Sequence, residues 1–238
     1  MPSHDPRIIV ALDLPSQAQA LALAERLDPK VCRVKVGLEL FVAAGPAILR
    51  DLSGLGYEIF LDLKFHDIPT TVGRAVERAC ALDVWMLNVH ALGGLRMLEA
   101  ASKASQGSAT RLIGVTILTS HDEADLAALG LSDAPARVQA LAALCRQAGL
   151  HGVVCSAQEA GLLRAAHGPQ FTLVTPGIRP QGAGLDDQRR VLTITQALLE
   201  GAHYLVLGRP ITQASDPKAA LEACVMEVAR YEATQAGS

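Results

Sequence analysis

Residues 58–71 read EIFLDLKFHDIPTT, and this stretch decides how the rest of the chain is interpreted. Its residues alternate as in a β-strand, where successive side chains point to opposite faces of the sheet. The aliphatic residues at positions 59, 61 and 63 then share one face, whereas Asp62 and Lys64 lie on the other. Pro69 has no backbone N–H for a strand ladder and closes the segment. The stretch therefore predicts a strand that ends with a carboxylate and an ammonium on one face.

Charged residues at the end of a buried strand need a partner or a use. Burial removes a charge from water, and only pairing offsets that cost. A second carboxylate, Asp67, follows Lys64, and a second lysine, Lys35, stands between two valines in the earlier run VKVG. A structural ion pair is the alternative for any one of these charges, but all four together indicate an active site. They are Lys35, Asp62, Lys64 and Asp67.

The rest of the chain repeats one unit, a short apolar run followed by an Ala- and Leu-rich stretch. We predict strands near 7–13, 31–36, 57–64, 84–90, 111–118, 151–155, 171–175 and 203–207. We predict helices near 16–27, 38–53, 70–82, 93–105, 136–148, 157–166, 193–200 and 217–232. This alternation predicts a single-domain (β/α)8 TIM barrel over residues 1–238, with a polar tail from about residue 233. A doubly wound open sheet is the alternative, but the first turn, ALDLP, lacks the glycines typical of that fold.

Composition argues against several classes of partner. Of the 238 residues, 50% are hydrophobic and 3% are aromatic, and the formal net charge is −3. A chain with so few aromatic residues and no excess of positive charge is a poor match for nucleic acid. The 5 cysteines form no CxxC pair, which favours buried free thiols in a reducing compartment over disulfides or a zinc site. Because we find neither a signal sequence nor an apolar run of membrane-spanning length, we expect a soluble, cytoplasmic protein.

The remaining polar residues fall where a barrel places its chemistry, at the carboxyl ends of the strands. Asp13 and Lys35 are near the ends of the first two predicted strands, and Thr119 follows the fifth. After the last strand, Gly208 allows a close backbone approach, and Arg209 offers a forked donor for phosphate oxygens. The loops after the seventh and eighth strands of such barrels often bind phosphate. We therefore expect a phosphorylated ligand.

Two predicted connections, 119–135 and 176–192, are longer than the fold requires. Loops of this length in a compact domain are often lids or binding loops. A solvated insertion is the alternative for each of them.

Six motifs extend the comparison to nearly the whole chain. In order they are ALDLP, VKVGLELF, FLDLKFHDIPTTV, ILTS, TPGIRPQG with DQRR, and LGRPIT. Together they resemble the bacterial orotidine 5′-phosphate decarboxylases, and DLKFHDIP is a highly specific match. The resemblance implies a homodimeric (β/α)8 barrel that converts orotidine 5′-monophosphate (OMP) to UMP, the last step of de novo pyrimidine synthesis. It also implies that no metal ion and no organic cofactor takes part.

The resemblance assigns roles to individual residues. Lys35, Asp62, Lys64 and Asp67 correspond to an alternating lysine–aspartate array, whose last member, Asp67, would enter the active site of the neighbouring subunit. Lys64 would donate the proton to C6 of the pyrimidine, and Asp62 would lie near the substrate carboxylate. The implied substrate-binding residues are Asp13 and Lys35 at the ribose, Thr119 at the pyrimidine, Arg179, Gln188, Gly208 and Arg209 at the phosphate, and also Asp62 and Thr71.

Three other interpretations stay open. Keto-gulonate-phosphate decarboxylases and hexulose-phosphate synthases share the barrel and an Asp-x-Lys-x-x-Asp pattern but hold Mg²⁺, so sensitivity to EDTA would distinguish them. A phosphate-sugar epimerase would need histidine ligands, whereas His66 and His90, the histidines near relevant strand ends, are expected to be structural. A non-catalytic nucleotide-binding barrel would not require a proton donor at Lys64.

Overall fold

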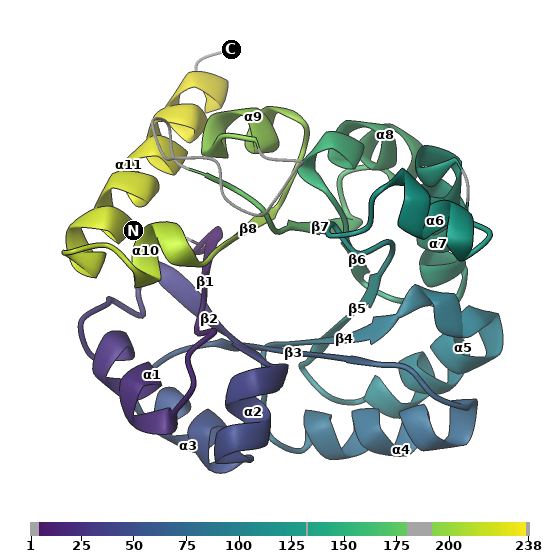
Figure 1. Cartoon of the computed structure of the whole chain (residues 1–238), viewed down its shortest axis with the longest axis horizontal. Helices are drawn as coiled ribbons and strands as arrows, with labels where there is room; N and C mark the ends of the chain where they lie inside the picture. The colour runs from purple at the N-terminus through teal and green to yellow at the C-terminus, as the bar shows by residue number, and fades with distance from the viewer. Residues whose placement is uncertain (1–4, 132, 180–191, 237–238) are drawn as a thin grey trace.

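In the described part of the chain, eight parallel strands pair in sequence order, and the last closes the barrel against the first. The computed structural model describes residues 5–131, 133–179 and 192–236. Helices surround the barrel on its outside (Figure 1). The prediction of a single-domain (β/α)8 TIM barrel is confirmed. The strands are β1 (Ile8–Ala11), β2 (Cys32–Gly37), β3 (Ile59–Phe65), β4 (Met86–His90), β5 (Arg111–Val115), β6 (Gly152–Val154), β7 (Thr172–Thr175) and β8 (Tyr204–Leu207).

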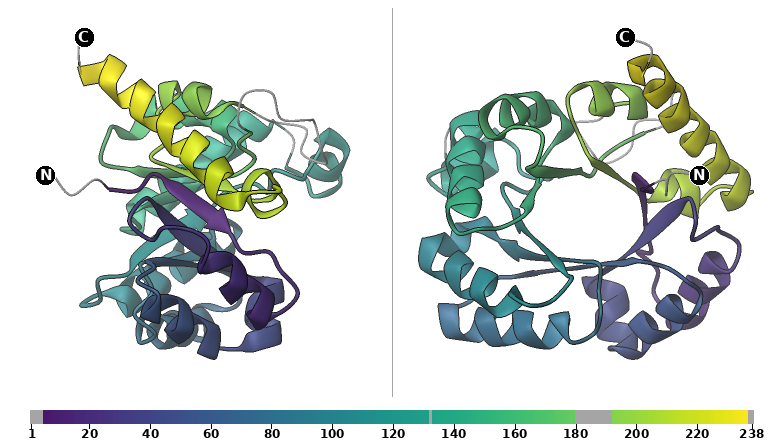
Figure 2. Two further views of the ribbon diagram at one scale, coloured as in Figure 1. Left: turned by 90° about the vertical axis from the view of Figure 1, so that its left-hand side faces the viewer. Right: turned by 180° about the vertical axis from the view of Figure 1, so that it is seen from behind.

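The helices follow the strands along the chain. The last helix, α11, lies on the outside of the barrel beside α9 (Figure 2). Within the described residues, no helix has both the length and the apolar content needed to cross a membrane. The helices are α1 (Gln17–Ala24), α2 (Leu38–Ala44), α3 (Ala47–Gly54), α4 (Pro69–Cys80), η1 (Ala91–Gly93, a 3-10 turn), α5 (Gly94–Ser105), α6 (Glu123–Ala128), α7 (Ala134–Gln147), α8 (Ala157–His167), α9 (Ile194–Leu199), α10 (Arg209–Thr212) and α11 (Pro217–Ala236).

The helices differ from the sequence prediction at several places, among them a short α10 at Arg209–Thr212 that was not predicted. The helix predicted over 38–53 is interrupted at Gly45, which has a φ of 63° and precedes a proline, so α2 ends there and α3 begins anew. The predicted connection 119–135 contains α6, because Asp122 and Asp125 form a capping box at its start. Helix α11 continues to Ala236, into residues expected to belong to the polar tail.

Side chains alternate along each strand and form two separate apolar cores. The outward-facing residues, such as Ile8, Val34 and Leu61, pack under the helices. The inward-facing residues fill the barrel itself. They are Ile9, Ala11, Phe60, Met86, Ile113, Val174, Tyr204 and Val206. Since this inner core is packed, polar side chains on the same inward register can gather only at the two ends of the barrel.

The five cysteines are all free and buried, as the sequence predicts. Burial raises the pKa of the Cys32, Cys145 and Cys224 thiols to about 12. Burial also raises the pKa of the Cys155 thiol. These thiols therefore stay protonated at neutral pH.

Candidate active site

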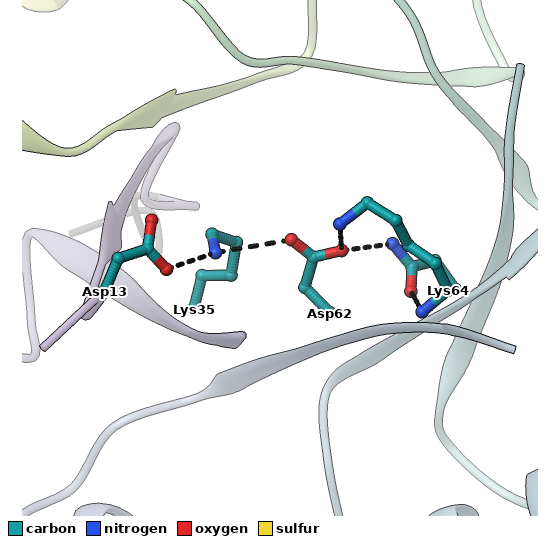
Figure 3. Close-up of polar contacts among 5 residues, drawn as sticks. Asp13, Lys35, Asp62 and Lys64 are labelled. Atoms are coloured by element: carbon teal, nitrogen blue, oxygen red, sulfur yellow. Dashed lines mark hydrogen bonds and ion pairs between the residues drawn. The ribbon is translucent and has the colours of Figure 1, made fainter. Parts of the chain in front are cut away.

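Four of the predicted side chains form a row of alternating charge at the carboxyl end of the barrel (Figure 3). The register between β2 and β3 pairs Lys35 with Phe60 and Gly37 with Asp62, so Lys35 and Asp62 enter the barrel from adjacent strands. Lys35 Nζ lies 2.8 Å from Asp13 Oδ1 and 3.3 Å from Asp62 Oδ2. Lys64 Nζ lies 2.7 Å from Asp62 Oδ1. One carboxylate is thus held between two ammonium groups.

The two central members of this row, Lys35 and Asp62, are stabilised in their ionised forms by their neighbours. Burial acts to raise the pKa of Asp62, but the ammonium groups of Lys35 and Lys64 and a hydrogen bond from Asn88 hold it below the ordinary value. Burial likewise acts to lower the pKa of Lys35, but Asp62 and Asp13 hold it above the ordinary value. Both residues are only 8% exposed. At neutral pH Lys35 and Asp62 therefore form a buried pair of fixed charges beside the cavity.

Gly37 at the end of β2 gives the ion pair its space. A Cβ atom at this position would lie 3.0 Å from Lys35 Nζ and 3.1 Å from Asp13 Oδ1. A side chain at this position would press on both charged groups, so at least one of them would have to shift. The glycine that ends the sequence VKVG is therefore part of the site's geometry.

Asn88 is a member of the site that our sequence analysis missed. It lies on β4 and is fully buried, with an exposed fraction of 0%. Its Nδ2 donates to Asp62 Oδ1 at 2.6 Å, and its Oδ1 accepts a hydrogen bond from the backbone N–H of Lys64 at 2.8 Å. The available signal was a single amide in the apolar strand sequence MLNVH.

A cavity of about 400 Å³ opens above this row of charges. It is lined by the four charged residues and by the predicted residues Thr119, Arg179, Gly208 and Arg209. The site thus joins residues that follow β5, β7 and β8 to the array on β2 and β3.

Arg179 contributes a buried cation to the cavity wall. It is 7% exposed, and its Nη1 donates to the carbonyl of Ile178 at 3.1 Å. Its Nε finds no hydrogen-bond acceptor within the part of the chain that the structure describes. A buried donor without a partner is costly, so this guanidinium suits a ligand that brings an anionic oxygen into the cavity.

Three predicted residues do not meet the others in the described chain. Asp67 and Thr71 lie just before and within the first turn of α4, are exposed, and do not line the cavity. The Asp67 carboxylate accepts a hydrogen bond from the backbone N–H of Ile68 at 2.6 Å. Gln188 lies outside the described residues. So do residues 180–191, which make up most of the predicted loop 176–192.

The two histidines near the strand ends pack against each other. The rings of His66 and His90 are stacked with their centroids 5.3 Å apart, and His90 Nδ1 accepts a hydrogen bond from the backbone N–H of Leu92. Burial, assisted by the nearby His66 and Lys64, lowers the pKa of His90 to about 4. Among the residues described, no three His, Cys, Asp or Glu side chains converge as metal ligands.

Fold and site together define a class of protein. A closed parallel barrel with charged side chains around a cavity at its carboxyl end is the architecture of TIM-barrel enzymes that act on small ligands. Two buried cations that line this cavity, Lys35 and Arg179, suit a ligand that carries negative charge.

Comparison with known proteins identifies the particular family. Residues 6–224 match the orotidine 5′-phosphate decarboxylase / HUMPS family, and the chain belongs to that family. It is 60% identical over 215 residues to the orotidine 5′-phosphate decarboxylase of Nitrosospira multiformis, covering 90% of each chain. It is 57% identical over 225 residues to the orotidine 5′-phosphate decarboxylase of Pseudomonas aeruginosa, covering 93% of this chain and 97% of the relative.

A solved structure agrees with these sequence comparisons. The crystal structure of orotidine 5′-phosphate decarboxylase from Lactobacillus acidophilus superposes with a TM-score of 0.83 at 39% identity, covering 94% of this chain and 99% of the other. The resemblance that the sequence motifs indicated is confirmed.

Proposed function

We propose that this chain decarboxylates OMP to UMP in pyrimidine biosynthesis, with Lys64 as the proton donor. The reaction is that of a carboxy-lyase, the activity for which its relatives are named. The observation that carries the catalytic assignment is the Asp62 carboxylate, held between the Lys35 and Lys64 ammonium groups at the floor of the cavity.

The chemistry of the reaction explains why an ammonium is needed. When the bond between C6 and the carboxyl carbon breaks, the electron pair stays on C6, where the pyrimidine ring delocalises it poorly. A positive charge next to C6 stabilises this developing negative charge. The same ammonium then forms the C6–H bond by transferring a proton, and solvent reprotonates the lysine. Lys64 meets both requirements because its Nζ projects toward the cavity.

Asp62 acts on the substrate carboxylate rather than on the proton. In our proposal the carboxylate of OMP lies against Asp62, and the repulsion between the two negative groups is relieved as neutral CO2 departs. This use of Asp62 requires a carboxylate that stays ionised and cannot turn away. Its two oxygens are held by Lys35, Lys64 and Asn88, which supports both requirements.

Residues that follow β7 and β8 bind the phosphate of OMP. Arg179 and Arg209 supply the positive charge, Gly208 permits a close backbone approach, and Gln188 joins them from the loop 176–192. The unpartnered Nε of Arg179 supports this assignment. Asp13 and Lys35 contact the ribose hydroxyls, and Thr119 lies beside the pyrimidine. Binding energy from the phosphate would be used to position the ring over Lys64.

The donor set argues against the Mg²⁺-dependent alternative. The two ammonium groups that contact Asp62 already neutralise its charge and would repel a divalent cation placed against the same carboxylate. We therefore propose that the reaction needs no cofactor. We also propose a cytoplasmic enzyme, in keeping with its five free, buried thiols.

Asp67 is proposed to act in a neighbouring subunit of a homodimer. It is exposed and does not line the cavity of its own chain, which supports a role in a second copy. Mixing Lys64→Ala and Asp67→Ala chains tests the proposal, because one site of each mixed dimer would then hold both Lys64 and an intact Asp67 from the partner. Recovery of activity on mixing supports donation between subunits. No recovery means that Asp67 acts within its own chain.

The first experiment on function is to follow ultraviolet absorbance as purified protein meets OMP, with and without EDTA. Conversion to UMP that is insensitive to EDTA is the expected result. Activity on ketose phosphates that requires Mg²⁺ would instead support the sugar-phosphate enzymes. Binding of UMP without any turnover of OMP would support the non-catalytic alternative.

A further inference from the structure

Strand β3 is irregular at the point where it carries Lys64. It pairs with β4 at Leu61–Leu87 and again at Phe65–Val89, so more residues of β3 than of β4 lie between the two pairs. Such a bulge removes backbone groups from the ladder and redirects side chains next to active sites. Lys64 lies in this bulge with a φ of 51°, a left-handed conformation that is unfavourable for a residue with a Cβ atom.

Asn88 supplies what the interrupted ladder lacks. The bulge leaves the backbone N–H of Lys64 without a strand partner, and Asn88 Oδ1 accepts it at 2.8 Å. The other end of the same amide, Nδ2, donates to Asp62 Oδ1 at 2.6 Å. That carboxylate oxygen also accepts from Lys64 Nζ at 2.7 Å. A single buried amide thus holds the backbone of one catalytic residue and the side chain of the other.

We infer that Asn88 is a positioning residue that fixes Lys64 and Asp62 relative to each other. The two contacts require one acceptor and one donor at the end of a short side chain, which is the chemistry of asparagine. An aspartate would keep the acceptor but would place a second negative charge against Asp62. An alanine would leave both the Lys64 N–H and one Asp62 lone pair unsatisfied in a buried place. The inference rests on the catalytic roles proposed for Lys64 and Asp62.

The position of Asn88 predicts which kinetic constant depends on it. Arg179 and Arg209, the proposed phosphate contacts, follow β7 and β8, whereas Asn88 lies on β4. Loss of the amide would let the strained backbone of Lys64 relax and carry its Nζ away from the reacting carbon. Substrate binding would stay largely intact while the chemical step slows, so kcat falls and KM changes little.

The test compares Asn88→Ala and Asn88→Asp with a matched control, Thr110→Val. Thr110 is also buried, and its hydroxyl donates to the Val84 carbonyl at 2.8 Å. It precedes β5 at the amino end of the barrel and does not line the cavity, so the control loses one buried hydrogen bond away from the site. We expect kcat for OMP to fall about 100-fold in both Asn88 variants, as for a displacement of about 1 Å at a reacting group. The control should keep its kcat.

A pH profile separates positioning from a general loss of structure. In Asn88→Asp the new carboxylate and Asp62 would share a proton, so the acid limb of the kcat profile should move to higher pH. Asn88→Ala adds no titrating group and should not show this movement. Should Asn88→Ala fail to fold, Asn88→Asp, which keeps the shape of the side chain, carries the test. Normal kcat and an unmoved profile in Asn88→Asp would overturn the inference.

Failure of the positioning role of Asn88 can be distinguished from failure of the proposed function. Wild-type protein that does not convert OMP would refute the proposed function itself. The positioning role is then judged from a crystal structure of Asn88→Ala. Departure of Lys64 from its positive φ supports the inference, and an unchanged Lys64 backbone and Asp62 carboxylate overturn it.

Discussion

The two ends of the barrel use the same strand in opposite ways. Arg33 and Lys35 both point inward from β2, Arg33 toward the amino end and Lys35 toward the carboxyl end. The Arg33 guanidinium lies 4.0 Å from the centre of the Trp85 ring. Its Nη2 is 2.6 Å from both Asp5 and Glu58, and its Nη1 donates to a backbone carbonyl. Lys35 faces a cavity instead.

The difference shows what separates a structural charge from a chemical one. Protein groups surround the Arg33 guanidinium and accept its hydrogen bonds, so Arg33 fills the amino end of the barrel. Lys35 shares Asp62 with Lys64, and the row that they form borders open space. A buried cation whose neighbours are all protein stabilises the fold, whereas one that borders a cavity is available to a ligand.

The largest effect should come from Lys64→Ala, which removes the chemical function of the carboxyl end. We expect kcat for OMP to fall by roughly 10⁴-fold or more, because both proton transfer and charge stabilisation are lost. The melting temperature, measured by circular dichroism, should stay close to that of the wild type. Lys218→Ala, at an exposed position in α11, is the control and should keep its activity. Near-normal turnover in Lys64→Ala would remove Lys64 from the mechanism.

The second effect should appear at the other end of the barrel and in the other quantity. Arg33→Met removes the hydrogen bonds of the guanidinium, but the exposed Asp5 and Glu58 carboxylates stay solvated, so the free energy of unfolding should fall by about 1.5–3 kcal/mol. The folded variant should keep its KM and kcat. Lys35→Met, two positions along the same strand, should lose turnover. Urea unfolding and OMP kinetics on both variants decide whether the two ends are separate.

Arg179→Ala should have a smaller effect, on binding. A hydrogen bond to a charged group is worth about 1.5–3 kcal/mol, so KM for OMP should rise by roughly 10- to 100-fold. If phosphate binding also positions the pyrimidine, kcat falls as well. Arg230→Ala, on the exposed face of α11, is the matched control. Unchanged kinetics would mean that the buried guanidinium belongs to the structural class of Arg33.

The smallest effect concerns pH. The folded-state pKa of Asp62 is held below its ordinary value, so its contribution to stability is present above the unfolded pKa of about 3.9 and is lost as pH falls through the lower folded value. Asp62→Asn removes this contribution. The difference in unfolding free energy between wild type and Asp62→Asn should therefore shrink below about pH 4. A difference that stays constant down to pH 2 would show that Asp62 is not stabilised as an ion.

Local patterns in the sequence predicted much of this molecule. Alternation in residues 58–71 correctly separated Phe60 and Asp62, which point into the barrel, from Leu61, which packs under the helices. The sequence also contains the signals for the helix end at Gly45 and for the capping box at Asp122. Our prediction nevertheless places a helix across Gly45 and a loop at Asp122.

Long-range features could not be predicted in this way. Asn88 acts on Asp62 and Lys64 across two strands, and nothing in the sequence MLNVH specifies that contact. The bulge at Lys64 depends on the register between β3 and β4, which is a property of the pair of strands. The contacts within one chain do not test the roles of Asp67, predicted to act in a neighbouring subunit, and Thr71, predicted to bind substrate, so both roles stay predictions.

Because its cysteines are buried, the protein is suited to labelling with a fluorescent dye at a single introduced cysteine. Thiol reagents attack the thiolate, and all five cysteines are buried, with the pKa of four of their thiols raised by that burial. Leu129, next to α6, is 57% exposed. A dye on Leu129→Cys would therefore react at one place and follow the segment after β5 as ligand enters, without removal of any native cysteine.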